Sequence, residues 1–309
     1  MEINKTTILI ILFVLVVYLT KSENYCSFGK TEGFRIQHSD FLDVDTIHSE
    51  KTPYQKLNII NIRRPFPLGK CLILDNEVQL CEYDEHRYHE MIVHFPTRYI
   101  YNLQLKNVLI VGGGDLMTLR EVMKYPTVEN VFLLEIDKAV INNSVKYLGS
   151  NPYTRDPRVK IIINDARNSI DFLLREEIYF DMIIIDTTED GDINTNIDDV
   201  NFYMKCKNML KDRGILIKNG SDFFYDLLTD VFPYAFRYSF PMKAFESNYE
   251  FILCSRYNVL TYNICENESI FNEYINPKIK YYKPKMHNKY INWHNILNLY
   301  DIPSRTLMI

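Results

Sequence analysis

The sequence predicts an α/β protein of two parts, a small β-rich segment followed by a larger domain built on a mostly parallel sheet. Three observations support this. Short apolar runs separated by Pro and Gly occur across residues 30–97, as in antiparallel strands. From about residue 105 onward, buried-strand patterns recur at helix-sized intervals, which is typical of βαβ units. With 309 residues, the chain is long enough for two parts and a substantial core.

In the β-rich part, residues 56–63 and 70–74 show the alternating or continuous apolar pattern of strands. Asp75 and Asn76 follow the second of these runs, and this residue pair favours a hairpin turn. Residues 84–94 carry apolar side chains at helical spacing, so we expect a helix there. We place all of these elements in an N-terminal β domain of residues 30–97.

In the larger domain, residues 98–309, short apolar runs alternate with amphipathic segments. The expected strands are residues 108–111, 131–134, 159–163, 182–185 and 215–217, and the expected helices are residues 116–124 and 138–148. Beyond about residue 258 the chain is rich in Asn and Tyr and shows no clear periodicity.

The composition is that of an ordinary globular protein, with 47% hydrophobic and 24% charged residues. The formal net charge of −5 and the absence of a basic stripe argue against a nucleic-acid-binding protein.

The N-terminus carries an apolar run, residues 8–19, with Lys5 before it and the small residues Thr20 and Ser22 after it. This run suits the core of a signal peptide and is short for a membrane span, which needs about 20 residues. We therefore expect residues 1–22 to be a cleaved signal peptide or a short membrane anchor. Either points toward the secretory pathway or a membrane.

The six cysteines include no CxxC pair, so a zinc or redox motif is not expected. An even number of cysteines permits disulfides if the chain is exported. Cys71 and Cys254 lie within apolar strand-like runs, where we expect buried free thiols.

A glycine-rich turn, Gly112-Gly113-Gly114-Asp115, directly follows the first expected strand of the larger domain. Glycines at such a turn let the backbone approach a ligand at the start of a helix. Glu135 ends the next expected strand, where an acid can bind ribose hydroxyls. The pattern predicts an adenosyl-group site.

Two more acids, Asp165 and Asp186, follow the third and fourth expected strands. Because the carboxyl ends of parallel strands share one edge of a sheet, these acids should converge with Asp115 and Glu135 on one ligand site. Asp is also a common helix N-cap, so either acid taken alone is explained as well by capping.

Several segments, taken in order and spacing, resemble the spermidine synthase family over about residues 30–285. The segments are Tyr54-Gln55, Leu74-Asp75 with Val78-Gln79, Asp84-Glu85 with Tyr88-His89-Glu90-Met91, Gly112-Gly113-Gly114-Asp115, Glu135-Ile136-Asp137, Asp156-Pro157-Arg158-Val159-Lys160, and Lys280-Tyr281-Tyr282 with His287. This resemblance implies a Rossmann-like, class I methyltransferase-type domain preceded by a small β domain. It also implies transfer of an aminopropyl group from decarboxylated S-adenosylmethionine to a polyamine such as putrescine.

The resemblance assigns roles to matching positions. Those for the donor's nucleoside are Gln55, Glu135, Asp165 and Ala166, with Gly112 in the turn beside them. Asp115 would bind the donor's amine, His89 and Glu189 the polyamine, and Asp186 would accept the proton with help from Tyr88. The family further implies a homodimer in the cytoplasm, with no metal and no cofactor besides the donor itself.

The role of Asp115 has a physical basis. The decarboxylated donor presents an ammonium group with no carboxylate beside it. A buried carboxylate attracts that ammonium and repels the carboxylate of ordinary S-adenosylmethionine.

The chain departs from the family pattern mainly in the polyamine half. Leu116 and Met117 replace two glycines, which we expect to reshape the loop near the donor's tail. Asn219-Gly220-Ser221 lacks a family acid, and Lys243 brings a positive charge toward a cation site. The family's assisting tyrosine has no clear match, and Phe245 and Tyr249 are the nearest aromatic residues.

These departures keep two other functions open, an S-adenosylmethionine-dependent methyltransferase and a non-catalytic relative. A metal site at His86, His89 and His94 is disfavoured, because the spacing lacks a paired acid and a second shell. The acidic run at residues 190–199 lacks the final Glu of a calcium loop, and we expect it to gate the ligand site.

Overall fold

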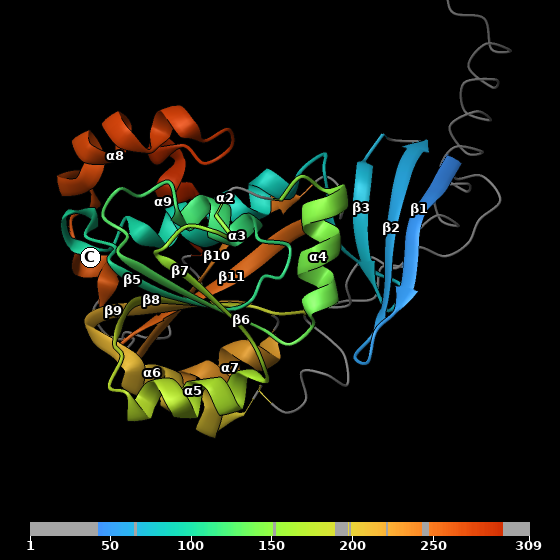
Figure 1. Ribbon diagram of the computed structural model, residues 1–309. Helices are drawn as coiled ribbons and strands as arrows, with labels where there is room; N and C mark the ends of the chain where they lie inside the picture. Colours follow the sequence, from blue (N-terminus) through green and yellow to red (C-terminus); the bar gives the residue numbers. More distant parts are fainter. Residues whose placement is uncertain are drawn as a thin grey trace, which may run out of the picture.

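The computed structural model describes residues 43–64, 67–150, 153–188, 197, 199–220, 222–242 and 247–292. These residues form a four-stranded antiparallel sheet and a seven-stranded mixed sheet with helices on both faces (Figure 1). The structure confirms the predicted α/β architecture. The predicted signal or anchor, residues 1–22, lies outside the described residues. Within them, no helix is both long and apolar enough to cross a membrane.

The smaller sheet has the strand order β1-β2-β3-β4. Its strands are β1 (Asp43–Lys51), β2 (Lys56–Arg64), β3 (Gly69–Leu74) and β4 (Glu77–Cys81). Asp75 and Asn76 both have positive φ, 47° and 72°, which is the conformation of a two-residue turn that matches the strand twist. The predicted hairpin is therefore confirmed.

The larger sheet has the order β10-β11-β9-β8-β5-β6-β7. The strands are β5 (Asn107–Gly112), β6 (Asn130–Glu135), β7 (Val159–Ile163), β8 (Phe180–Asp186), β9 (Leu210–Asn219), β10 (Tyr234–Met242) and β11 (Ser247–Ser255). β5 to β9 are mutually parallel, whereas β11 runs antiparallel to both of its neighbours, β9 and β10. From β5 the chain adds β6 and β7 on one side and then β8 and β9 on the other, so the strand order reverses between β5 and β8. Open α/β sheets bind ligands at such a point.

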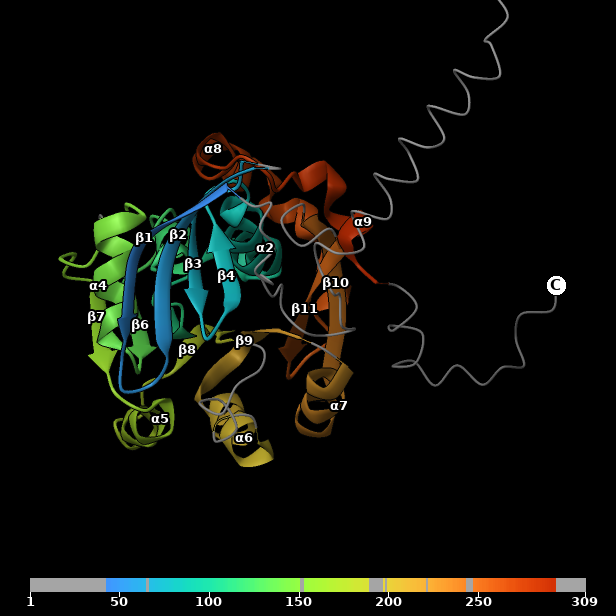
Figure 2. The ribbon, with the colours of Figure 1, turned by 90° about the vertical axis from the view of Figure 1, so that its right-hand side faces the viewer.

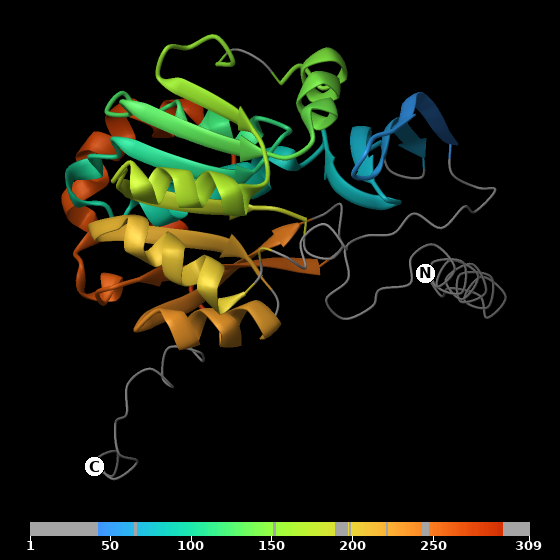
Figure 3. The same ribbon diagram turned by 60° about the horizontal axis from the view of Figure 1, so that its bottom comes forward.

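Two layers of helices cover this sheet. α5 (Ala166–Arg175), α6 (Val200–Met209) and α7 (Asp222–Val231) pack on one face (Figure 3). The other face carries α2 (Glu85–Thr97), α3 (Met117–Val122), α4 (Lys138–Tyr147), α8 (Glu268–Tyr274) and α9 (His287–Tyr290). Short 3₁₀ turns are η1 (Tyr101–Leu103), η2 (Val259–Thr261), η3 (Ile264–Asn267), η4 (Asn276–Lys278) and η5 (Pro284–Met286).

Helix α2 belongs to the core of the larger sheet, although the sequence placed it in the β domain of residues 30–97. Its side chains Met91, Val93 and Phe95 are fully buried in the same apolar cluster as β5. The smaller sheet thus ends at β4.

The smaller sheet lies beside α4, as Figure 1 and Figure 2 show. Leu57, Leu72 and Leu80 from this sheet form one buried cluster with Met117 and Val140. This packing brings the β1–β2 turn close to the end of β6.

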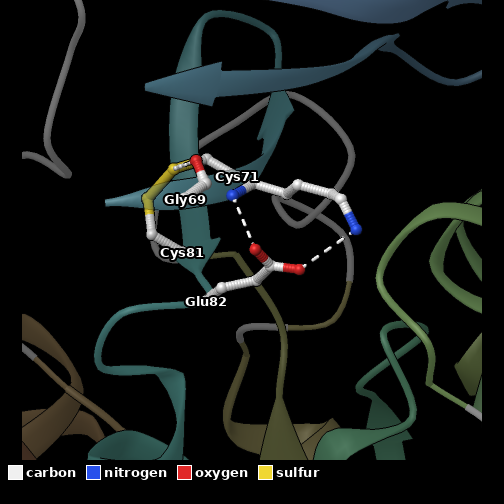
Figure 4. The surroundings of a disulfide bond; sticks show 5 residues. Gly69, Cys71, Cys81 and Glu82 are labelled. Carbon is white, nitrogen blue, oxygen red and sulfur yellow. Dashed lines mark hydrogen bonds and ion pairs between the residues drawn. A yellow bond between two sulfur atoms is a disulfide. The ribbon is translucent and has the colours of Figure 1, made fainter. Parts of the chain in front are cut away.

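The cysteine prediction is wrong at Cys71, which forms a disulfide with Cys81 (Figure 4). The two residues are direct partners across β3 and β4, and neighbouring strands place such side chains within bonding reach. Glu82, next to this bond, accepts hydrogen bonds from Lys70. Cys254 is a buried free thiol, as predicted.

Candidate active site

The glycine-rich turn lies at the carboxyl end of β5 and packs against the end of β8. Gly112 and Gly113 have φ of +80° and +64°, a conformation that residues with side chains rarely adopt. The Gly113 N–H donates to the Asp186 carbonyl at 2.8 Å. A Cβ at Gly112 would lie 2.3 Å from the same oxygen. Only glycine fits here, because the turn is held directly on the neighbouring strand.

Glu135 ends β6 and faces this turn. A Cβ at Gly114 would lie 2.5 Å from Glu135 Oε2, so the third glycine makes room for the carboxylate. The Asp137 N–H donates to Glu135 Oε1 at 2.8 Å. Burial raises the pKa of Glu135 to about 7, and the charges of Asp137 and Asp115 add to the effect. A hydrogen-bond donor or a cation here would relieve that cost.

Gln55 reaches this region from the smaller sheet. Its Nε2 donates to Asp137 Oδ2 at 3.0 Å, and Thr52 Oγ1 donates to the same oxygen at 2.8 Å. The other oxygen of Asp137 caps α4 by accepting from the Ala139 N–H at 3.0 Å. Gln55 is therefore linked through Asp137 to Glu135, and its nucleoside-binding role stays a prediction.

Asp165 and Ala166 lie one strand further along. Asp165 caps α5 by accepting from the Arg167 N–H at 2.8 Å, so the capping alternative holds for this acid. The preceding residue, Asn164, donates its N–H to the Glu135 carbonyl at 3.1 Å. The pair lies at the same edge as Glu135, and its nucleoside-binding role stays a prediction.

Three side chains converge from three different elements. His89 on α2, Asp115 in the turn and Asp186 at the end of β8 each have a ligand atom within 4.8 Å of the others'. His89 Nε2 lies 3.6 Å from Asp115 Oδ1. The predicted acids Asp115, Glu135 and Asp186 thus gather around the glycine turn, with Asp165 at its outer end.

Asp186 is held by two hydroxyl groups. Tyr88 Oη donates to Oδ1 at 2.7 Å, and Thr118 Oγ1 donates to Oδ2 at 2.5 Å. Burial raises the pKa of Asp186, with the negative charge of Asp115 adding to it and His89 opposing it. Thr118 is absent from the sequence prediction. Its position three residues after Asp115, in the first turn of a helix, is the signal that could have suggested it.

The two residues that replace family glycines do not line this site. Leu116 and Met117 are buried in separate apolar clusters, one under the larger sheet and one against the smaller sheet. Leu116 has φ of 67°, a left-handed conformation that ordinarily favours glycine. Both side chains fill cores, and the expected reshaping of the loop near the donor stays a prediction.

The acceptor side is described only in part. Asn219 Nδ2 donates to the Thr187 carbonyl at 2.9 Å and to Tyr249 Oη at 3.4 Å. The Tyr249 ring packs edge-on against Tyr88 with 5.2 Å between centroids, so Tyr249 lies where an assisting hydroxyl is expected. Glu189, Lys243, Phe245 and most of the predicted gate at residues 190–199 lie outside the described residues.

The histidines of α2 do not converge on one metal position. His94 bonds Tyr125 and Glu121 through its two ring nitrogens, whereas His89 faces Glu85 and Asp115. A histidine with an acid at each nitrogen is suited to carry a proton on both, and a doubly protonated ring has no lone pair for a metal.

Comparison with known proteins gives a consistent picture. The family profile of the spermine/spermidine synthase domain matches residues 85–263. A polyamine aminopropyltransferase of Thermoanaerobacter sp. (strain X514) is 39% identical over 204 residues, 65% of this chain and 71% of that protein. A polyamine aminopropyltransferase of Buchnera aphidicola subsp. Acyrthosiphon pisum (strain Tuc7) is 34% identical over 212 residues, 67% and 71% of the two chains.

Two solved structures are similar across most of the fold. One is a spermidine synthase in complex with the transition-state analogue AdoDATO, with a TM-score of 0.69, 28% identity and coverage of 82% of this chain and 87% of that one. The spermidine synthase of Thermotoga maritima has a TM-score of 0.69 and 28% identity, with 82% and 86% of the chains covered.

Proposed function

Because the chain belongs to the spermine/spermidine synthase family, we propose that it transfers an aminopropyl group from decarboxylated S-adenosylmethionine to a polyamine such as putrescine. The products are spermidine and 5′-methylthioadenosine. The observation that carries this proposal is the convergence of Asp115 and Asp186 beside the glycine turn. Two carboxylates at one point suit two cationic substrates, the donor's ammonium and the polyamine.

Donor binding follows from the order of groups along the edge. Gln55, Glu135 and the Asp165-Ala166 pair would hold the nucleoside, and Asp115 the aminopropyl ammonium. Because Asp115 repels a carboxylate, it would favour the decarboxylated donor over ordinary S-adenosylmethionine. Glu189 would then bind the polyamine, and His89 would lie near it.

In the chemical step, a neutral amine nitrogen forms a bond to the carbon beside the sulfonium while the carbon–sulfur bond breaks. Asp186 accepts the proton from that amine, and Tyr88 orients the carboxylate. An amine of pKa about 10.4 and an Asp of about 3.9 differ by roughly 6 units, or about 9 kcal/mol in water. Burial raises the pKa of Asp186 and would lower that of the amine, so both changes reduce this difference. Positioning of the two substrates contributes further.

We expect no metal or cofactor besides the donor, because the leaving sulfonium and the base supply the required chemistry. We also expect a homodimer.

The decisive experiment incubates the purified protein with the decarboxylated donor and a panel of polyamines. Release of 5′-methylthioadenosine with one of them supports the proposal. Absence of release with every acceptor would favour a non-catalytic relative instead.

The matched variant is Asp186→Asn, which keeps the shape of the side chain and removes the base. Turnover should drop at least about a hundredfold, the usual scale for losing a proton acceptor, while calorimetry should find donor binding nearly intact. Unchanged turnover would exclude Asp186 from the mechanism. Tighter calorimetric binding of ordinary S-adenosylmethionine than of the decarboxylated donor would favour a methyltransferase.

For location, the Cys71–Cys81 disulfide supports export, because disulfides persist mainly in oxidising compartments. A fusion of residues 1–25 to a reporter tests this, and a reporter that stays in the cytosol would contradict it.

A further inference from the structure

His89 lies between two carboxylates. Its Nδ1 is 3.0 Å from Glu85 Oε2 and 2.6 Å from the Glu85 carbonyl, one helical turn earlier on α2. Its Nε2 faces Asp115 at 3.6 Å. The side chain is only 2% exposed, so water can replace neither partner. Both ring nitrogens therefore face acceptors, an arrangement that suits the imidazolium form.

Glu85 is itself fixed from the opposite side. Arg120 on α3 donates through both terminal nitrogens to the two carboxylate oxygens of Glu85, at 3.1 and 2.8 Å. Its Nε donates to Glu121 Oε1 at 2.8 Å. Glu121 is buried and bonds His94 through its other oxygen. A bidentate guanidinium–carboxylate pair is geometrically restrictive, so this chain of contacts from the helix core sets the position of Glu85.

A cationic His89 offsets the repulsion between the two carboxylates at the glycine turn. Asp115 and Asp186 are close enough to repel each other, and both lie beside the glycine turn. Arg120 is occupied by Glu85 and Glu121. Burial opposes a charge on His89, but the contacts with Asp115 and Glu85 outweigh it and raise the pKa of His89 to about 10. Burial also opposes ionisation of Glu85, yet His89 and Arg120 lower its pKa to about 2.

We propose that Glu85, clamped by Arg120, is a positioning residue that fixes the His89 ring and keeps it a cation between Asp115 and Asp186. This proposal rests on the proposed function, since it explains how Asp186 stays ionised and able to accept a proton while a second carboxylate lies beside it. The titratable and charged groups around His89 are Glu85 and Tyr88 on α2, Asp115 in the turn, Arg120 on α3 through Glu85, Asp186 on β8 and Tyr249 on β11.

The first experiment needs no substrate. Histidine side chains of the whole protein are labelled and titrated by NMR, and the His89 signal is assigned by its loss in His89→Asn. In the unaltered protein His89 should remain doubly protonated above pH 8, and Glu85→Gln should lower its midpoint by at least about one pH unit. A neutral His89 at pH 7, or a midpoint unchanged in Glu85→Gln, would overturn the proposal. Because the assay uses free protein, it succeeds or fails independently of the proposed activity.

The second experiment follows kcat against pH. In Glu85→Gln the acidic limb should move about one pH unit upward, because Asp186 then holds its proton more tightly, and Glu85→Asp should restore part of the shift. If Glu85 had only a structural role, Glu85→Gln would lower kcat at every pH without moving the acidic limb. That result would contradict the proposal. Should Glu85→Gln fail to fold, Arg120→Lys provides the same comparison with a smaller shift. The control is Glu129→Gln, an exposed acid paired only with Lys106 in the described structure, which should leave the profile unchanged.

Discussion

A single carboxylate, that of Asp115, sets the choice of donor in the mechanism we propose. Its Oδ1 is anchored by the Met117 N–H at 2.7 Å, and the side chain is only 14% exposed. Asp115→Asn keeps this anchor and removes the charge. We expect calorimetric binding of the decarboxylated donor to weaken roughly 10- to 100-fold, the range for losing a hydrogen bond to a charged group. Binding of ordinary S-adenosylmethionine should stay the same or tighten. Equal weakening of both donors would show that Asp115 acts only through the shape of the turn.

Other residues of the site differ in how far the sequence could reveal them. Asp186 and Tyr88 were predicted from motif order, and the structure places them in contact. Thr118 and Arg120 were missed, because their contacts depend on how α3 packs against the end of β8 and against α2. Leu116 was interpreted as a change in the site because it replaces a glycine, whereas its side chain turns into the core.

At the scale of elements, the predicted strands β5, β6 and β8 have the most uniform environments. β5, β6 and β8 are buried on both sides, so their sequences are continuous apolar runs. Helix α2 was predicted as a helix within residues 30–97, whereas its apolar face packs on the larger sheet. Periodicity shows which face of a helix is apolar and not which sheet that face covers. The segment beyond residue 258 showed no period, because it consists of helices and turns too short to repeat a pattern. Its buried side chains join the core one or two at a time, and individual polar contacts also hold it in place.

Glu90 on α2 makes the clearest of those contacts. Its buried carboxylate accepts the backbone N–H groups of Lys280, Tyr281 and Tyr282 at 2.6, 2.6 and 2.9 Å. Glu90→Gln removes the charge and turns half of the acceptor into a donor. We expect a loss of about 2–4 kcal/mol in the free energy of unfolding, the scale for leaving buried donors unsatisfied, and faster hydrogen exchange at these three amides. Unchanged exchange there would contradict this anchoring role.

The disulfide is a second contact that stabilises secondary-structure elements, because it joins the neighbouring strands β3 and β4 of the smaller sheet. Cys71 and Cys81 close a loop of 10 residues. The chain-entropy relation assigns such a loop about 3 kcal/mol of stabilisation. The double variant Cys71→Ser, Cys81→Ser should lose at least roughly 2 kcal/mol in urea unfolding, and reductant should destabilise the parent chain but not the variant. Peptide mapping under non-reducing conditions checks the bond directly, and a free thiol at either position would exclude it.

For the molecule as a whole, the C-terminal segment closes against α2 through a neutral histidine. His287 bonds Tyr282 Oη at 2.6 Å through Nδ1 and Tyr99 Oη at 2.9 Å through Nε2, and its ring stacks on Phe95 at 4.1 Å between centroids. Burial, with Arg98 nearby, lowers the pKa of His287 to about 3. Because the folded-state pKa lies below the unfolded value of 6.5, the stability that this group contributes is present above pH 6.5 and is lost as the pH falls toward 3.

The free energy of unfolding of the whole protein contains this contribution from His287 and one of opposite sign from Glu135. Burial raises the pKa of Glu135 to about 7, so folding gains stability from that group as the pH falls from 7 to 4.5. Comparison with His287→Gln separates the two, because Glu135 is common to both chains. The difference in unfolding free energy between the parent and His287→Gln should shrink from pH 6.5 downward, by up to about 1.4 kcal/mol per pH unit. Tyr282→Phe removes one hydrogen bond but leaves the imidazole to titrate, so it should lower stability and keep the slope. If the curves of the parent and His287→Gln ran parallel in urea unfolding between pH 6.5 and 5, the buried imidazole would not be neutral, and this closure of the C-terminal segment would need a different electrostatic basis.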